Sequence, residues 1–293
     1  MRVYINEVAP RDGFQNEQCF IDTDKKIEFI NQLSRCGYSK IEVSSFTSPK
    51  AIPALRDAEQ VMRAIDRNPN VIYTALVPNL KGAERALSSK VDEINLVMSC
   101  SEAHNQSNLR MSKQQSKDQL KAIIQSVNKQ CDINISLSTS FGCPIQKDVP
   151  FADVLKLVHF FSDLGVSRFT LCDTTGMAYP TQVKDLFSTV LQQFPHLEVT
   201  AHFHNTRGLA LANTLASLES GIIRFDSSLG GIGGCPYAPG ASGNISTEDL
   251  VHMLHLMNIT TGVNLNTIIE IGKQLPALIG HSTDSHISKA GIR

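Results

Sequence analysis

The sequence lacks three features that would each point to a class of protein: an excess of charge, a long apolar run and a paired-cysteine motif. Its formal net charge of −1 gives no sign of binding to nucleic acid or to an anionic membrane surface. No apolar run approaches the roughly 20 residues that a membrane helix needs. The seven cysteines never stand in a CxxC spacing, which favours reduced thiols over a disulfide framework or a zinc–sulfur site.

Recognisable targeting signals are also missing. Met1 to Ile5 runs directly into a strand-like segment, so we expect neither a signal peptide nor a transit peptide. Ala290 to Arg293 is not a peroxisomal or retention signal. We therefore expect a cytoplasmic protein. Because no linker or low-complexity tract interrupts the chain, we expect one catalytic domain over residues 1–293, with a core over 1–260 and a helical extension over 261–293.

Short strand-like runs alternate with longer amphipathic segments along the chain. The strand candidates are Val3–Val8, Lys40–Ser44, Val71–Val77, Glu93–Met98, Ile133–Thr139, Arg168–Cys172, Glu198–Phe203 and Ile222–Ser227. The helix candidates are Asp22–Cys36, Ile52–Arg67, Leu80–Ser88, Ser116–Gln130, Pro150–Leu164, Pro180–Phe194, Leu209–Ser220 and Thr247–Met257. These alternations predict an α/β fold, a closed (β/α)8 TIM barrel with an added C-terminal helix over Leu265–Leu278. An open doubly wound sheet is the alternative, although Gly230–Gly234 lacks the GxGxxG spacing and a P-loop lysine.

A His-x-His pair, His202 and His204, ends the seventh predicted strand. Side chains at positions i and i+2 of a strand point to the same face, so the two imidazoles can bind one ion. Asp12 follows the first strand and Asn244 follows the eighth, at the end of the barrel where active sites collect. These four side chains are candidate ligands for a divalent metal, Mg²⁺ or Mn²⁺, with Zn²⁺ or Co²⁺ as other options. The structural alternatives are a hydrogen-bonded histidine pair and simple turns at Asp12 and Asn244.

Four more side chains are candidates for chemistry at the same end of the barrel. Arg11 places a guanidinium where an oxygen can gain negative charge, unless it only forms an ion pair. Glu42 lies in an apolar strand and is costly to bury without a partner such as Arg11. Cys235, in a glycine-rich loop, is either a proton donor or an inert thiol. Asp173 follows the sixth strand and is either a site carboxylate or a cap for the next turn.

Four segments together resemble the 3-hydroxy-3-methylglutaryl-CoA lyase family, which belongs to the metal-dependent lyase and acyltransferase TIM barrels. These segments are Glu7–Glu17, Ser45–Lys50, Val77–Gly82 and Gly230–Asn244. The resemblance implies cleavage of 3-hydroxy-3-methylglutaryl-CoA, or a closely related 3-hydroxyacyl-CoA, to acetyl-CoA and a 3-oxoacid such as acetoacetate. This is a reaction of leucine catabolism and ketone-body formation. A homodimer is expected by the same analogy.

The resemblance also implies a role for each candidate residue. The divalent ion would be held by Asp12, His202, His204 and Asn244. Arg11 would stabilise the enolate of the departing acetyl-CoA, and Cys235 would protonate it. Proton transfer would be assisted by Glu42, Asp173 and His202. The substrate would be contacted by Arg11, Gln15 and Asn108, the last in segment Ser101–Ser112, which resembles the family's CoA-contacting loop unless it is only a polar surface loop.

The chain departs from the family pattern near the substrate end of the pocket. Cys172 and Thr175 stand where the family usually has glycine and isoleucine, and Asn205 replaces an aspartate after the His-x-His pair. Asn134 and Ser136 stand where the family commonly has arginine and an aromatic residue. These differences leave the acyl group open, with a related 3-hydroxy-3-carboxymethyl acyl-CoA or another 3-hydroxyacyl thioester as the rival substrate.

Three rival functions share parts of this pattern. A Claisen-type acyltransferase, such as isopropylmalate or homocitrate synthase, uses a similar barrel and His-x-His pair but usually carries a C-terminal regulatory extension. A non-catalytic metal-binding barrel would keep the ion without turnover. An aldolase acting on a free 4-hydroxy-2-oxoacid would need the metal and the barrel but no groove for coenzyme A.

Overall fold

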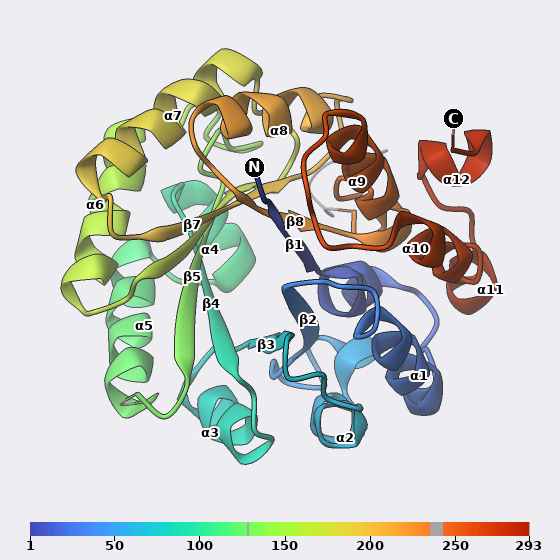
Figure 1. Cartoon of the computed structure of the whole chain (residues 1–293). Helices are drawn as coiled ribbons and strands as arrows, with labels where there is room; N and C mark the ends of the chain where they lie inside the picture. The colour runs from blue at the N-terminus through green and yellow to red at the C-terminus, as the bar shows by residue number, and fades with distance from the viewer. Residues whose placement is uncertain (128, 235–242, 293) are drawn as a thin grey trace.

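Eight parallel strands form a closed barrel in chain order in the computed structural model, which describes residues 1–127, 129–234 and 243–292 (Figure 1). Strands β1 and β8 close it, with Tyr4 opposite Arg224 and Glu7 opposite Ser227. The strands are β1 (Tyr4–Glu7), β2 (Lys40–Ser45), β3 (Ile72–Leu76), β4 (Glu93–Ser99), β5 (Asp132–Ser138), β6 (Arg168–Asp173), β7 (Glu198–Phe203) and β8 (Arg224–Ser227). The predicted (β/α)8 barrel is confirmed, and the open sheet is excluded.

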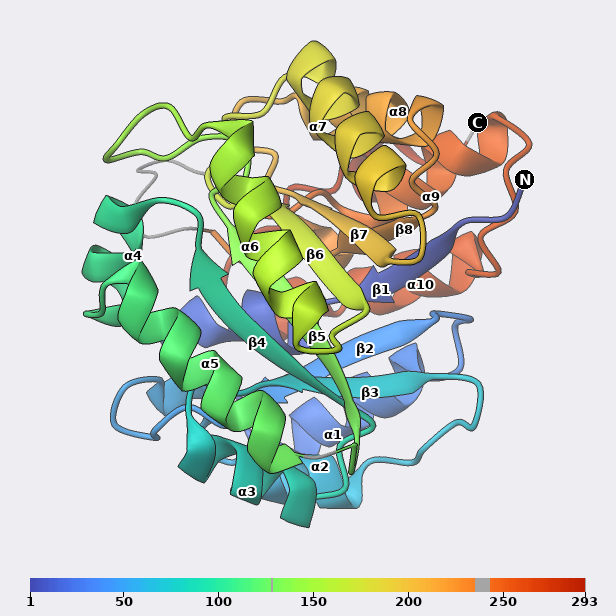
Figure 2. The same ribbon diagram turned by 90° about the vertical axis from the view of Figure 1, so that its left-hand side faces the viewer.

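Helices surround the barrel (Figures 1 and 2), and their buried apolar residues form one core cluster with those of the strands. In α6, Val154, Leu157, Val158 and Phe161 recur at helical spacing, and all four are buried. The helices between and directly after the strands are α1 (Thr23–Leu33), α2 (Ala58–Ala64), α3 (Leu80–Ser88), α4 (Glu102–Leu109), α5 (Lys113–Val127), α6 (Phe151–Asp163), α7 (Pro180–Gln193), α8 (Ala210–Glu219) and α9 (Thr247–Leu256). No described helix combines the length and apolarity needed to cross a membrane.

Short helical turns connect several of these elements. They are η1 (Ala9–Gly13), η2 (Phe14–Asn16), η3 (Pro53–Leu55) and η4 (Leu229–Gly231). The predicted helix over Ile52–Arg67 is wrong as one element, because it divides into η3 and α2. The division falls at Asp57, whose carboxylate accepts hydrogen bonds from Thr23 Oγ1 at 2.8 Å and Lys26 Nζ at 2.7 Å on α1.

The C-terminal segment adds helices beyond the barrel, as expected, but in three pieces: α10 (Leu265–Gly272), α11 (Leu275–Ile279) and α12 (His286–Ala290). The single helix predicted over Leu265–Leu278 is interrupted before Pro276, because proline has no N–H to donate and its ring crowds the preceding turn. Helix α12 lies beside α9, where the Asp249 carboxylate accepts hydrogen bonds from the backbone N–H groups of His286 at 3.0 Å and Ile287 at 2.8 Å (Figure 1).

Charged side chains close the barrel at the end where the strands begin. Glu93, at the start of β4, accepts from Lys40 at 2.5 Å and from Arg168 at 3.1 Å. Glu198, at the start of β7, pairs with Arg224 at 2.8 Å. These first residues of their strands fill the amino-terminal end of the barrel with matched charges. The barrel is therefore open to ligands at the opposite end, where the strands finish.

Candidate active site

Arg11 and Asp12 lie on the turn η1, which directly follows β1. The Val8 carbonyl accepts backbone hydrogen bonds from Arg11 at 3.1 Å and Asp12 at 2.7 Å. The Glu7 carboxylate accepts from the Ala9 N–H at 2.9 Å and fixes the start of the same turn. This local geometry turns the chain directly after β1 and places both candidate side chains there.

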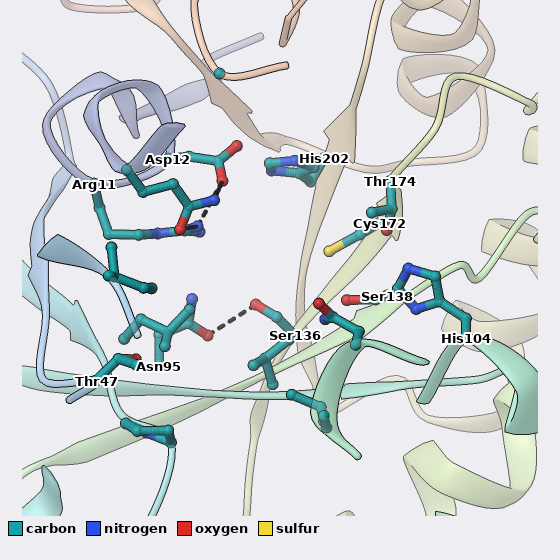
Figure 3. A pocket seen from close by; sticks show the side chains of 18 of the residues that line it. Arg11, Asp12, Thr47, Asn95, His104, Ser136, Ser138, Cys172, Thr174 and His202 are labelled. Carbon is teal, nitrogen blue, oxygen red and sulfur yellow. Dashed lines mark hydrogen bonds and ion pairs between the residues drawn. The ribbon is translucent and has the colours of Figure 1, made fainter. Parts of the chain in front are cut away.

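Asp12, His202 and His204 converge as a buried set of side chains that could hold a metal ion. One ligand atom from each residue lies within 4.8 Å of the others. The imidazoles come from β7 and the residue just after it, and their ring centroids are 5.3 Å apart. The expectation that the His-x-His pair faces one side of the sheet is confirmed, and Figure 3 shows Asp12 beside His202.

The polar atoms of this triad fit a divalent cation. Among the described residues, His204 Nδ1 is buried without a hydrogen-bond partner, and His204 Nε2 lies 3.9 Å from Asp12 Oδ2, too far for a hydrogen bond. Burial and the neighbouring His202 lower the pKa of His204 to about 4. Burial alone would raise the pKa of Asp12, but Arg11 and the imidazoles outweigh it and lower the pKa to about 2. A neutral imidazole beside an ionised carboxylate is the protonation state that binds metal.

Asn244 lies against Asp12, as its assignment as a fourth ligand requires. Its Nδ2 donates to Asp12 Oδ2 at 2.7 Å and to the Ile232 carbonyl at 3.1 Å. The amide oxygen is the atom left to bind an ion. The packing also explains a glycine, because a Cβ on Gly233 would lie 2.6 Å from Asn244 Nδ2 and the residue has a φ of +101°.

Arg11 is held by two carboxylates. Its Nε donates to Glu42 Oε2 at 2.6 Å, and its Nη1 donates to Asp12 Oδ1 at 2.5 Å. The expected contact between Arg11 and Glu42 is confirmed. Gln15 joins the group, because its Nε2 donates to Asp12 Oδ1 at 3.0 Å. Burial raises the pKa of Glu42 even though Arg11 and Asn95 both favour the carboxylate.

Asp173 makes the contacts of a turn cap, which was the structural alternative for this residue. Its two oxygens accept from the backbone N–H groups of Met177 at 2.7 Å and Ala178 at 3.1 Å. It is fully buried and is not among the residues that line the cavity. Burial raises its pKa to about 6, while His202 and the two backbone donors oppose that rise.

A cavity of about 480 Å³ opens beside the triad and is lined from several strands and loops. Gln15 and Asn108 line it, as substrate-contacting residues should. Asn108 lies on α4, so the expected loop over Ser101–Ser112 is largely a helix, capped where the Ser101 hydroxyl accepts from the His104 N–H at 3.2 Å. The sequence of α4 is polar and lacks the apolar periodicity from which a helix is predicted. Cys235 lies outside the described residues; Gly233 and Gly234, just before it, line the cavity.

The substitutions that distinguish this chain from the family pattern fall at and around the cavity. Ser136 and Cys172 line it, and Figure 3 shows the Cys172 sulfur pointing inward. Asn134 lies two residues before Ser136 on β5, and its Nδ2 donates to Asn95 Oδ1 at 3.0 Å. Thr175 is buried. Asn205 accepts from the Ala210 N–H at 3.2 Å and so supports the start of α8.

Two polar residues in the cavity wall were missed by the sequence analysis. Asp226 on β8 lies 3.2 Å from His202 Nδ1, and Asn95 on β4 donates to Glu42 Oε1 at 2.8 Å. Burial alone would lower the pKa of His202, but Asp226 outweighs it and raises the pKa. The available signal was the same for both: a polar residue within an otherwise strand-like run, next to apolar residues.

Comparison with known proteins gives consistent matches along the chain. The family model described as HMGL-like matches residues 2–275. Hydroxymethylglutaryl-CoA lyase YngG of Bacillus subtilis is 47% identical over 280 residues, covering 95% of this chain and 94% of that protein. The human mitochondrial hydroxymethylglutaryl-CoA lyase is 40% identical over 293 residues, covering 99% and 89%. The structure of an HMG-CoA lyase from Acinetobacter baumannii with coenzyme A and 3-methylmalate is 49% identical, covers 99% and 95%, and superposes with a TM-score of 0.95.

Proposed function

The chain belongs to the HMGL-like family, and from this premise we propose that it cleaves 3-hydroxy-3-methylglutaryl-CoA to acetyl-CoA and acetoacetate in a metal-dependent reaction. The observation that carries the proposal is the convergence of Asp12, His202 and His204 beside Arg11 at the mouth of a cavity. Relatives of nearly equal length carry the hydroxymethylglutaryl-CoA lyase name.

Separate residues would bind the ion, stabilise the enolate and transfer protons, which are the three tasks that the reaction requires. Asp12, His202 and His204 would hold Mg²⁺ or Mn²⁺, with the Asn244 amide oxygen as a fourth ligand. A divalent ion held there would supply Lewis-acid polarisation of the substrate's hydroxyl oxygen.

Arg11 meets the negative charge that develops when the carbon–carbon bond breaks. The departing acetyl-CoA leaves as a thioester enolate, and a preorganised cation in a buried site stabilises such an oxyanion strongly. Glu42 and Asp12 hold the guanidinium at 2.6 and 2.5 Å, so little reorganisation is needed. By resemblance to the family, Cys235 would deliver the proton to the enolate carbon, and Glu42 and His202 would assist proton transfer. Asp173, which caps a turn and does not line the cavity, would assist only through its electrostatic interaction with His202.

Coenzyme A would enter along the rim of the cavity, with Asn108 and Gln15 as contacts. The A. baumannii relative is in complex with coenzyme A and 3-methylmalate, which supports an acyl-CoA substrate for this chain. Ser136 and Cys172 are small, uncharged residues in the cavity wall, so a related 3-hydroxyacyl-CoA is the second substrate to test. We further propose a homodimer on the family analogy, and a cytoplasmic location because the seven cysteines never stand in a CxxC spacing and are typical of reduced thiols.

The direct test is formation of acetyl-CoA from 3-hydroxy-3-methylglutaryl-CoA and related 3-hydroxyacyl-CoAs in the presence of Mg²⁺. Release of acetyl-CoA and acetoacetate is the expected result. Release of free thiol from acetyl-CoA and a 2-oxoacid would instead identify a Claisen-type acyltransferase. Tight metal binding without turnover of any thioester in the panel would identify a non-catalytic barrel.

A further inference from the structure

Asp226 connects His202, in the candidate metal site, to Asn6 on strand β1. It lies on β8 directly opposite His202 of β7 in the sheet register. Its Oδ2 is 3.2 Å from His202 Nδ1, and its Oδ1 accepts from Asn6 Nδ2 on β1 at 2.9 Å. Asn6 is fixed in turn, because its Oδ1 accepts from the Ser39 hydroxyl at 2.9 Å. Four residues from separate parts of the chain thus form one chain of hydrogen bonds that ends on an imidazole.

This contact determines which nitrogen of His202 is left for an ion. A neutral imidazole has one N–H and one lone pair, on different nitrogens. A carboxylate accepts but does not donate, so the Nδ1 of His202 must carry the proton and the Nε2 must carry the lone pair. His204 has no matching partner among the described residues, since its Nδ1 is buried without a hydrogen bond. Asp226 therefore acts on one of the two imidazoles only.

We infer that Asp226 is a positioning residue of the metal site, which holds the His202 ring in the orientation and tautomer that bind the ion. Carboxylates that accept from the distal N–H of a ligating histidine fix the ring and raise its basicity, and their removal typically weakens metal binding by about 10- to 100-fold. Because Asp226 lines the same cavity, it is also close enough to act on substrate instead, and the experiment must separate the two roles. The inference rests on the metal site of the proposed function but not on its substrate.

The test measures Mn²⁺ affinity by titration calorimetry in the full-length protein, without substrate. Asp226→Asn and Asp226→Ala should each weaken Mn²⁺ binding by about 10- to 100-fold, with the larger loss for alanine, which cannot accept a hydrogen bond. Asn6→Ala should cause a smaller loss in the same direction, because it removes the group that orients Asp226. Asp132→Asn is the matched control, since Asp132 is a strand carboxylate at the opposite end of the barrel that pairs with Arg168; its Mn²⁺ affinity should equal that of the unmodified protein.

A second measurement follows the absorption spectrum of bound Co²⁺, which reports ligand geometry independently of turnover. A changed spectrum in the Asp226 variants supports the inference. Unchanged Mn²⁺ affinity in both Asp226 variants, with a raised KM for the acyl-CoA, would overturn it and place Asp226 at the substrate. If Asp226→Ala does not fold, Asp226→Asn and Asn6→Ala still decide the question. Intact Mn²⁺ binding without lyase activity would overturn the proposed function alone, whereas absence of Mn²⁺ binding in the unmodified protein would overturn both.

Discussion

Arg11→Gln removes the guanidinium that lies between the metal ligands and the cavity, while it keeps a polar side chain of similar reach. In the unmodified protein, Arg11 is 11% exposed and is bound by Asp12 and Glu42. The charge therefore acts in a site with little water, where one preorganised donor to an oxyanion is worth about 2.7–4 kcal/mol. We expect kcat for acetyl-CoA formation to fall by about 100- to 1,000-fold.

The metal site should survive the same substitution. Arg11 is not a ligand, and loss of a positive neighbour leaves Asp12 more attractive to a cation. Arg11→Gln should therefore bind Mn²⁺ at least as tightly as the unmodified protein in titration calorimetry. The combination of lost turnover and retained metal separates a role in the transition state from a role in holding the site together.

Two further variants sharpen this measurement. Arg11→Lys keeps the charge but loses the planar fork that meets Glu42 and Asp12, so an intermediate kcat is expected. Arg35→Gln is the control for loss of an arginine, because Arg35 forms an exposed pair with Asp66 at 3.6 Å and should leave kcat unchanged. Full lyase activity in Arg11→Gln would refute the assignment of Arg11 to the developing charge.

Four other predictions test separate parts of the structure. Chelation with EDTA should abolish acetyl-CoA formation, and Mg²⁺ or Mn²⁺ should restore it; activity that persists in a protein shown to be metal-free would contradict the metal site. Asn108→Ala should raise KM for the acyl-CoA several-fold with kcat nearly unchanged, since Asn108 lines the cavity but is not one of the triad. Asn95→Leu should lower the free energy of unfolding by about 1–3 kcal/mol in urea titrations, because Glu42 and Asn134 lose buried hydrogen bonds. Burial raises the pKa of Glu7 to about 7, so the stability that its protonated side chain contributes is present at pH 4 and is lost as the pH rises through 7. The free energy of unfolding of the metal-free protein in urea should fall over this pH range, and Glu7→Gln should make that fall smaller.

The barrel could be predicted because each of its strands carries a local signal. Glu198–Phe203 and Leu80–Ser88 have the same bounds in the sequence analysis and in the structure. The position of Arg11 and Asp12 just after a strand was enough to place them at the barrel mouth, because parallel strands all end at one face. The contact of Arg11 with Glu42 follows from that placement and from the cost of burying a lone carboxylate.

What could not be predicted depends on contacts between strands. Nothing in the local sequence says that Asp226 lies opposite His202, because that pairing is set by the stagger of β7 against β8. The same holds for Asn95, whose partners Glu42 and Ser136 come from β2 and β5. Helix α4 escaped notice for another reason: its polar residues have no apolar period, and its start depends on the hydroxyl of Ser101.

Glu7 shows how a residue outside the cavity can set the geometry inside it. Its Oε1 accepts from the backbone N–H groups of Ala9 and Leu229, both at 2.9 Å, and its Oε2 accepts from the Thr247 hydroxyl at 2.8 Å. One buried carboxylate therefore joins the turn that carries Arg11 and Asp12 to the start of the glycine-rich segment and to α9.

These contacts make Glu7 a common anchor for two parts of the site that are far apart in sequence. A displacement of about 1 Å in reacting groups can cost about 100-fold in rate. Replacement of Glu7 by a side chain that cannot bind both loops, such as alanine, should therefore reduce turnover although it touches no substrate. Glutamine keeps an acceptor for the two N–H groups and can donate to the Thr247 oxygen, so Glu7→Gln should retain most of the activity that Glu7→Ala loses. Equal activity in the two variants would show that the turn and the glycine-rich segment hold their positions without this anchor.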